Sequence, residues 1–321
     1  MDRRLILDLI DLGRPGLEIG ALDKPTVTRA HGPVAYVDRA DRAALAAWYA
    51  DPGHGLDPAD LVDVDHVWGE ETLLQAVGGQ RAFAYVIASH VIEHVPDVFG
   101  WLGEIAAVLE DGGRAVFAVP DKRFSFDYPR PPSTSGEFVE AWLEGRRRPN
   151  TRQIFNHFHD TRPEGAPDRD EAALTEWAQG CVALCRRAVS LDEYIDAHGW
   201  VFTPVSMAQA LDLASRLELL PFRIADFQPT PPGDAEFMVT LERLPDSWDF
   251  AARRAAFLES LQALELPPET QTTGAAPDLL ARAEAAIAHA QAIEASTFWR
   301  MTAPLRRLVD AARRLSSGSR R

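Results

Sequence analysis

The sequence predicts an α/β fold: a seven-stranded sheet with a mainly helical insert after the fifth strand and a helical tail at the C-terminus. From Gly16 to Arg243, short apolar or β-branched runs alternate with longer helical stretches, which is typical of α/β proteins. About 80 residues separate the fifth strand from the next helix of the core, too many for an ordinary loop. After Arg243 the chain is Ala-rich and helical in pattern.

Seven runs have the length and residue content of strands. In chain order they cover residues 16–20, 34–38, 61–65, 84–89, 115–120, 222–228 and 236–243. Helices are expected in three stretches of the core and two of the insert, at about 41–50, 97–109 and 204–218, and at about 170–187 and 191–198. Asp111-Gly112-Gly113 would close the second core helix, and Pro204 suits the first turn of the third.

These elements divide the chain into three parts. Residues 1–120 and 199–243 are expected to form the core, residues 121–198 the insert, and residues 244–321 a helical extension with a basic end. Open α/β sheets bind ligands beyond the carboxyl ends of their strands, where such an insert would form the acceptor site or a lid.

Composition limits the classes of function. The net charge of −15 argues against nucleic acid as the main partner. Cys181 and Cys185 have the spacing of neither a redox pair nor a zinc knuckle, so both are expected to be buried thiols. No run approaches the roughly 18 apolar residues of a membrane span, and Asp8 interrupts the apolar run at the start. A cytoplasmic protein without a signal peptide is therefore expected.

The first motif, RPGLEIGALDKPTV, suits a cationic ligand. Glu18 stands two residues before Gly20, where a strand runs into a tight turn. A carboxylate can face a cation there, and the glycine permits close approach of the backbone. A nicotinamide cofactor would require G-x-G-x-x-G, whereas only Gly16 and Gly20 are present.

Acids follow the next two predicted strands. Asp38 comes 18 residues after Gly20, about where an acid binds the ribose hydroxyls of a nucleoside cofactor. Asp63 and Asp65 close the third predicted strand, where an acid can reach an adenine amino group. Both can equally be surface acids at the end of a strand.

Together, LEIG, VDRAD, SHVIEHVPD and LEDGGRAVFAVPD resemble the class I S-adenosylmethionine-dependent methyltransferases over residues 14–243. The resemblance implies a Rossmann-like sheet with its last strand antiparallel and S-adenosyl-L-methionine as the cofactor. It also implies a cofactor site at the strand ends that includes Glu18, Gly20, Asp38 and Ser89, with His90 following in the next loop. The chain departs from the family at the missing third glycine of the first motif and at Ala84, where an Asp is common.

A narrower resemblance concerns the acceptor. VPDKRFSFDYPRPP, FTPVSM and STFWRMTAPLRRL are similar to a bacterial subgroup found with glycosyltransferases of cell-surface polysaccharide synthesis. This implies O-methylation of a sugar hydroxyl, on a glycan or on a nucleotide- or lipid-linked sugar. Two alternatives are methylation of a quinone-like or other small molecule, and a catalytically silent methyltransferase-like scaffold. Six aromatic residues would suit a flat acceptor: Phe124, Phe126, Tyr128, Trp142, Phe155 and Phe158.

A neutral hydroxyl needs a group that removes its proton. The insert offers His157 and His159 beside Asp160, which could orient an imidazole, and His94 after the fourth strand is the rival. His198 is a third candidate. No metal site is expected, because His-x-His without further ligand spacing is common by chance.

The C-terminal end has the charge of a docking segment. Residues 300–321 hold seven arginines against one acid, a net charge of +6. Arginines mixed with Trp299, Leu305 and Leu308 are expected of a helix that docks onto a glycosyltransferase or lies peripherally on the inner membrane surface. Plain packing of this segment on the core is the alternative.

Overall fold

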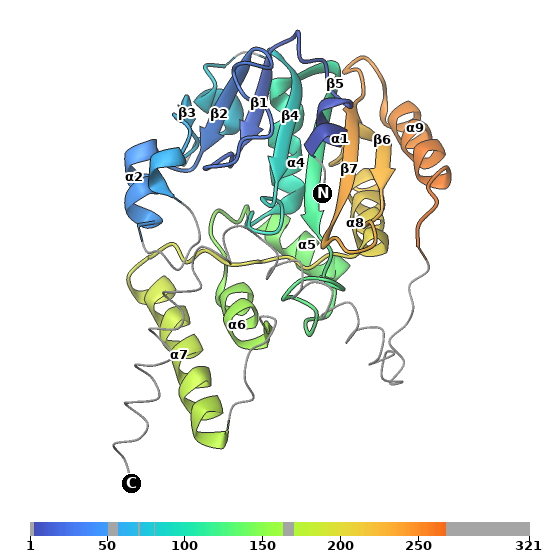
Figure 1. Cartoon of the computed structure of the whole chain (residues 1–321). Coiled ribbons are helices and arrows are strands. Elements are labelled where there is room, and N and C mark those ends of the chain that lie inside the picture. Colours follow the sequence, from blue (N-terminus) through green and yellow to red (C-terminus); the bar gives the residue numbers. More distant parts are fainter. Residues whose placement is uncertain (1–2, 51–56, 70, 80, 163–169, 268–321) are drawn as a thin grey trace. The chain divides into compact units, whose positions relative to one another are not determined.

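The computed structural model describes residues 3–50, 57–69, 71–79, 81–162 and 170–267. Seven strands form one sheet in the order β3-β2-β1-β4-β5-β7-β6 (Figure 1). They are β1 (Gly16–Ile19), β2 (Val34–Asp38), β3 (His66–Val67), β4 (Phe83–Ser89), β5 (Leu109–Pro120), β6 (Phe222–Gln228) and β7 (Glu236–Arg243). Neighbours from β3 to β5 are parallel, and β7 is antiparallel to both β5 and β6. The predicted seven-stranded sheet with an antiparallel last strand is confirmed.

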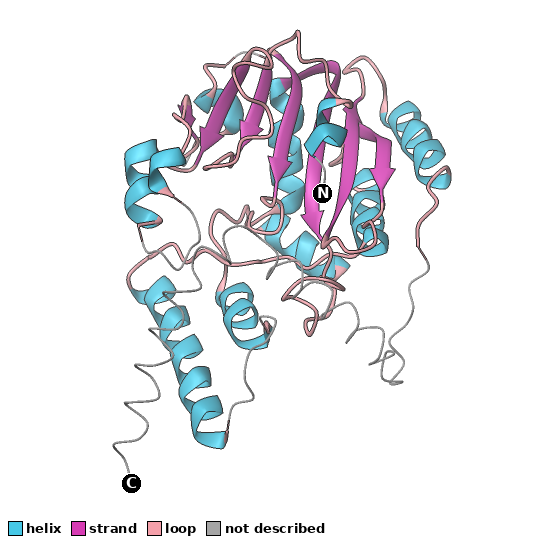
Figure 2. Cartoon of the chain, in the orientation of Figure 1, coloured by secondary structure: helices cyan, strands magenta, loops and turns pink. Residues whose placement is uncertain are grey.

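Helices flank this sheet (Figure 2). The core contains α1 (Arg3–Leu7), α2 (Arg42–Trp48), α3 (Leu73–Ala76), α4 (Val98–Val108), α8 (Pro204–Arg216), α9 (Phe250–Gln262) and the short 3₁₀ helix η2 (Pro58–Asp60). The insert contains α5 (Ser135–Leu143), α6 (Thr151–Asp160) and α7 (Glu171–Ser190), so it is mainly helical as predicted. Within the described residues, no helix is both long and apolar enough to cross a bilayer. The predicted basic end lies outside the described residues.

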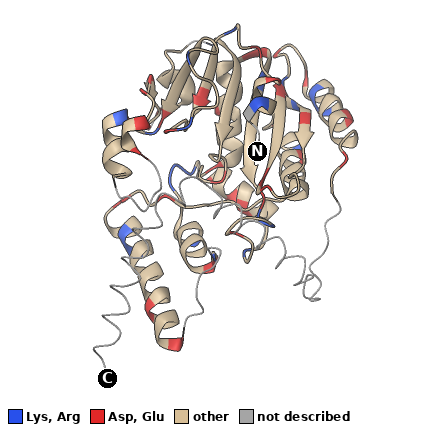
Figure 3. Ribbon diagram, in the orientation of Figure 1, with Lys and Arg blue, Asp and Glu red and all other residues tan. Residues whose placement is uncertain are grey.

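The sheet is buried on both faces because successive strand residues point to opposite sides. In β4, Val86 and Ala88 join one apolar cluster, whereas Tyr85 and Ile87 join the other. Side chains of α4, α5, α8 and α9 complete the first cluster, and Ile6 of α1 joins the second. Figure 3 shows charged residues on the helices and in the loops at the ends of the strands. Both faces of the sheet are therefore apolar, and polar groups gather at the carboxyl ends of the parallel strands.

Capping residues fix where two core helices begin. The Asp97 carboxylate accepts a hydrogen bond from the Gly100 N–H and starts α4 immediately after the loop that follows β4. Thr203 and Ser206 form a capping box around Pro204, which occupies the first position of α8 as predicted. Both helices thus begin at the edge of the sheet where the parallel strands end.

The third strand was predicted at the wrong residues. Residues 61–65 form no strand, and β3 is only His66–Val67, paired with Val37 and Asp38. The Asp65 N–H still donates to the Tyr36 carbonyl at 2.9 Å, but the Tyr36 N–H donates to the Asp65 carboxylate at 2.8 Å instead of to a backbone carbonyl, and the same carboxylate binds Arg29 at 2.9 Å. Regular strand pairing therefore begins only after Asp65.

Residues 191–198 form no helix, contrary to the prediction. The chain leaves α7 through Asp192, whose φ of 51° is a left-handed conformation that ends helical hydrogen bonding. It then runs without regular structure, and the Trp200 N–H donates to the Glu93 carbonyl at 3.2 Å. This strap, residues 191–203, therefore lies against the loop that follows β4.

Two smaller features also differ from the prediction. Asp111-Gly112-Gly113 is part of β5, which begins at Leu109 directly after α4 and has an irregular register opposite Phe83 and Tyr85. Cys181 is buried, but Cys185 is only partly so.

Candidate functional site

A cavity of about 550 Å³ opens at the carboxyl ends of β1, β2 and β4. Such a volume suits a ligand of nucleoside size. The strand ends contribute Gly20, Asp38, Arg39, His90 and His94 to its wall, and the insert contributes Arg146, Arg147, Arg148, Tyr194 and Asp196. The parallel sheet and the insert therefore share one site, as expected for an open α/β sheet.

Gly20 lets a ligand approach the backbone at the end of β1. Its φ is 68°, a left-handed conformation that favours glycine. A Cβ atom at this position would lie 2.9 Å from Cγ2 of Val91. Gly20 lines the cavity, in the place where the sequence predicted a close backbone contact.

Asp38 lines the cavity at the end of β2. Its Oδ1 accepts the Arg39 N–H at 2.7 Å. Burial raises the pKa of this carboxyl to about 6, more than the hydrogen bond and charge of Arg39 lower it. The carboxylate is well placed to accept hydrogen bonds from vicinal hydroxyl groups of a ligand.

Glu18 lies outside the cavity lining. Its buried carboxylate accepts the backbone N–H groups of Thr26 at 2.6 Å and Val27 at 3.0 Å. The acid therefore holds the loop that joins β1 to β2.

Asp63 and Asp65 also lie outside the cavity lining. Asp63 is exposed and paired with Arg42 at 2.9 Å, while Asp65 binds Arg29. Because β3 begins after Asp65, the residues that reach the cavity are instead Trp68 and Gly69. The feature of the sequence that could have indicated this wall is Trp68, an aromatic residue directly after β3.

The loop after β4 brings two histidines to the cavity. Ser89 does not line it, but His90 does, with a left-handed φ of 54°. The His90 Nε2 is hydrogen-bonded to Glu236. Burial opposes the charged imidazole, yet the hydrogen bond and the nearby carboxylates outweigh burial and raise the pKa of His90.

His94 is paired with Asp196 of the strap. The Nδ1 atom lies 3.0 Å from Oδ1 of Asp196, and both residues line the cavity. Burial opposes the charge on His94, but Asp196 and Glu93 raise its pKa to about 9. The same pair lowers the pKa of Asp196 to about 2 against the effect of burial. Asp196 had no signal in the sequence, because the strap was read there as a helix.

His157, His159 and Asp160 lie on α6 and do not line the cavity. The His157 Nδ1 accepts the backbone N–H of His198 at 3.1 Å, and burial with the nearby His198 lowers the pKa of His157 to about 3. His159 and Asp160 are exposed and hydrogen-bonded to each other at 2.6 Å. The sequence motif thus brings His159 and Asp160 together, but away from the cavity.

His198 belongs to a buried network beside the cavity. Its Nδ1 lies 2.6 Å from Oδ2 of Asp127, and Arg130 donates to the other Asp127 oxygen at 2.6 Å. The ring of His198 packs edge-on against His94, with centroids 4.6 Å apart. Two carboxylate-bound imidazoles, from different segments, therefore meet at the cavity wall.

Comparison with known proteins assigns the chain to a family. The model of the methyltransferase domain matches residues 28–214, more than half of the chain. No curated protein matches the sequence.

Solved structures that resemble the chain have low identity. A methyltransferase dependent on S-adenosylmethionine from Methanosarcina mazei is 14% identical, with 75% of this chain and 98% of that chain covered and a TM-score of 0.37. A putative one from Listeria monocytogenes is 12% identical, with 76% and 98% covered and a TM-score of 0.38. A putative zinc-dependent alcohol dehydrogenase from Rhodobacter sphaeroides is 14% identical, with 76% and 90% covered and a TM-score of 0.44. The family assignment therefore rests on the domain model.

Proposed function

Because this chain belongs to the methyltransferase-domain family, with S-adenosyl-L-methionine as its expected cofactor, we propose that it methylates a sugar hydroxyl. The acceptor would be a glycan or a nucleotide- or lipid-linked sugar. When bound, the cofactor would supply a methyl carbon that the hydroxyl oxygen attacks in line, with the carbon–sulfur electron pair staying on sulfur and the hydroxyl proton passing to a general base or to water.

The strand ends fit such a cofactor. Asp38 can accept hydrogen bonds from both ribose hydroxyls, and the backbone at Gly20 leaves room for a close approach. The Trp68 ring is available to pack on the adenine. These residues bind and orient, which is the main task of an enzyme whose methyl donor is already activated.

We expect cofactor affinity to fall as the pH drops through 6. The pKa of Asp38 is raised to about 6, so its ionised form, which accepts the ribose hydroxyls, is lost below that pH. The raised pKa also means that ionised Asp38 lowers the free energy of unfolding above pH 6. This loss of stability disappears as the pH falls from 6 toward 3.8, the usual pKa of an aspartate. Titration calorimetry with S-adenosylhomocysteine should show a dissociation constant that rises up to about tenfold per unit below pH 6.

Asp38→Asn is the matched variant for this measurement. It keeps the size of the side chain and removes its titration, so its weaker binding should be nearly independent of pH between 5 and 8. An equally steep pH dependence in Asp38→Asn would assign the effect to another group.

The acceptor class is supported by the arginine-bearing wall that the insert adds to the cavity. Arg147 and Arg148 line it, with about half of each side chain exposed. Arg147 lies 3.0 Å from Glu104 and Arg148 lies 3.1 Å from Asp192, contacts that hold the guanidinium groups in place. Planar guanidinium groups suit hydroxyl-rich and phosphorylated ligands.

The flat-acceptor alternative has less support from the cavity. Its lining includes none of the six aromatic residues that would suit such an acceptor, namely Phe124, Phe126, Tyr128, Trp142, Phe155 and Phe158. Three of them, Phe124, Phe126 and Tyr128, are exposed. Other aromatic residues do line the cavity, namely Tyr49, Trp68, Trp101 and Tyr194, so the preference for a sugar rests on the arginine-bearing wall.

We expect the double variant Arg147→Gln/Arg148→Gln to raise the KM for the acceptor by about 10- to 100-fold, the effect of losing charged hydrogen bonds. The affinity for S-adenosylhomocysteine should change little. Arg152→Gln is the control, because Arg152 is another half-exposed arginine of the insert, paired with Glu137 and Glu140, that does not line the cavity. An unchanged KM in the double variant would remove the arginine wall from the acceptor site.

The proposed function is tested in two steps. Titration with S-adenosylhomocysteine separates an enzyme from a silent scaffold, which would show no binding. Methyl transfer to nucleotide sugars and lipid-linked glycans, measured beside quinone-like phenols, then identifies the acceptor. Transfer to the phenols alone would overturn the sugar assignment.

A further inference from the structure

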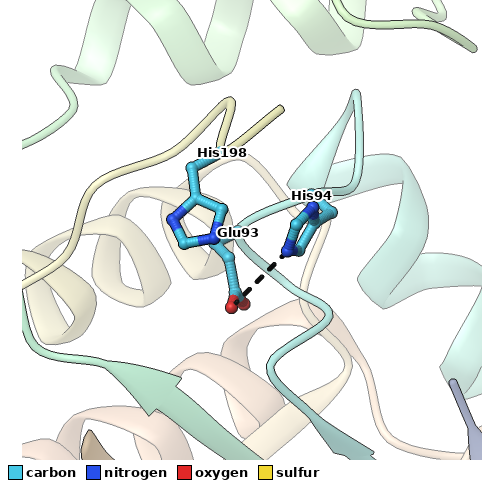
Figure 4. A group of neighbouring side chains, drawn as sticks. All are labelled: Glu93, His94 and His198. Atoms are coloured by element: carbon cyan, nitrogen blue, oxygen red, sulfur yellow. Dashed lines mark ion pairs between the residues drawn. The ribbon is translucent and has the colours of Figure 1, made fainter. Parts of the chain in front are cut away.

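Three potential metal ligands meet behind the wall of the cofactor cavity. Glu93 and His94 come from the loop after β4, and His198 comes from the strap. Each offers one ligand atom, and the three atoms lie within 4.8 Å of one another. Figure 4 shows the Glu93 carboxylate beside both imidazoles. Ligands of a tetrahedral zinc ion are about 3.4 Å apart, so each pair of ligand atoms would have to approach by at most about 1.4 Å to complete the site.

Glu93 is a buried acid whose carboxylate has no hydrogen bond within the described part of the chain. The residue is 1% exposed, and neither carboxylate oxygen has a hydrogen-bond partner among the described residues. Two imidazole nitrogens, Nδ1 of His90 and Nε2 of His94, are 3.6 and 3.9 Å from Oε1, too far for hydrogen bonds. A buried carboxylate in this state is costly unless a cation satisfies it.

Both histidines are oriented as metal ligands usually are. Nδ1 of His94 is held by Asp196 at 3.0 Å, and Nδ1 of His198 by Asp127 at 2.6 Å. A carboxylate on Nδ1 fixes the orientation of the ring and directs Nε2 to an ion, which displaces any proton from that nitrogen when it binds. The Nε2 atom of His94 is the one that faces Glu93.

We propose that Glu93, His94 and His198 bind one divalent transition-metal ion, with zinc the best fit to two imidazoles and a carboxylate. A second group, Asp127, His157 and His198, shares one ligand with the first. There the carboxylate is already taken by His198 and Arg130, and the guanidinium would repel an ion. The first group is therefore the site.

The position of the site indicates its use. Glu93 and His198 lie behind the wall, whereas His94 reaches the cavity. Three protein ligands leave one coordination position open, as in catalytic zinc sites. The catalytic part of the inference rests on the proposed function: a sugar hydroxyl bound at the open position would be held near the methyl group, with its proton made more acidic.

The metal itself is the probe in the test. The full chain is stripped with a chelator, dialysed and titrated with Zn²⁺ in a calorimeter, without cofactor or acceptor. We expect one ion per chain. In Glu93→Gln and in His198→Asn the affinity for Zn²⁺ should fall by about 100-fold or more. The control His31→Asn removes an exposed histidine, whose Nδ1 accepts the Thr28 N–H, and should bind like the parent.

A second measurement needs no variant. Co²⁺ bound to the parent protein should give the strong visible absorption of a four-coordinate ion. Absence of a stoichiometric site, the weak absorption of hydrated Co²⁺, or parental affinity in a folded Glu93→Gln would each overturn the inference. Metal binding without methyl transfer to any sugar would sink only the proposed function, and transfer by metal-free protein would sink only the catalytic use of the ion.

Discussion

Replacing His94 with asparagine is expected to lower the turnover number by about 10²- to 10⁴-fold, because the variant loses a ligand of the proposed metal ion that would make the hydroxyl proton more acidic. Among the described residues, His94 and His90 are the histidines that line the cavity, and the Nε2 of His90 is bonded to Glu236. His94 is oriented by Asp196, and it also links the cavity to Glu93 and His198. Single-turnover methyl transfer at saturating cofactor measures the loss directly.

The rival expectation from the sequence is the pair His157 and His159. The double variant His157→Asn/His159→Asn should lose less turnover than His94→Asn, because neither histidine lines the cavity. Cofactor affinity, measured in parallel, should stay close to that of the parent in both variants. A loss confined to the double variant would restore the assignment of the base to α6.

Glu18→Ala is expected to lower the free energy of unfolding by about 2 to 4 kcal/mol, since two buried N–H groups lose a charged acceptor. Those groups belong to Thr26 and Val27, which are 5% and 0% exposed. Denaturant unfolding at an unchanged slope measures the effect.

Asp63→Ala is the control for this substitution. The sequence predicted both acids to bind the cofactor, but Asp63 is exposed and paired only across the surface with Arg42. Its removal should change stability by less than about 0.5 kcal/mol. Parental stability of Glu18→Ala, combined with weaker cofactor binding, would return Glu18 to a direct role at the cofactor.

Side-chain direction explains why part of the candidate site could be predicted and part could not. Gly20 and Asp38 stand at the ends of two adjacent parallel strands, joined by a loop without a helix, and such ends meet at one edge of a sheet. Glu18 follows the same pattern, yet backbone N–H groups eight and nine residues later bind its carboxylate. Sequence spacing does not encode such competition.

The insert shows the same division. Its helical character was predictable from composition, but the path of the strap was not, because a single left-handed residue, Asp192, ends the helix. The strap then places Asp196 and His198 beside the loop after β4. A metal site was not expected from the sequence, since its proposed ligands lie on segments about a hundred residues apart.

The sequence by itself determined the α/β class and six of the seven strands, because apolar periodicity is a local property, and its motifs indicated the family and with it the antiparallel last strand. Only the tertiary structure decided which acids face the cavity and which hold loops, and which of the histidines reach it. The physical reason is that a side chain takes the partner that packing brings to it. For Glu93, His94 and His198 that partner comes from another part of the chain, and their meeting follows from the fold as a whole.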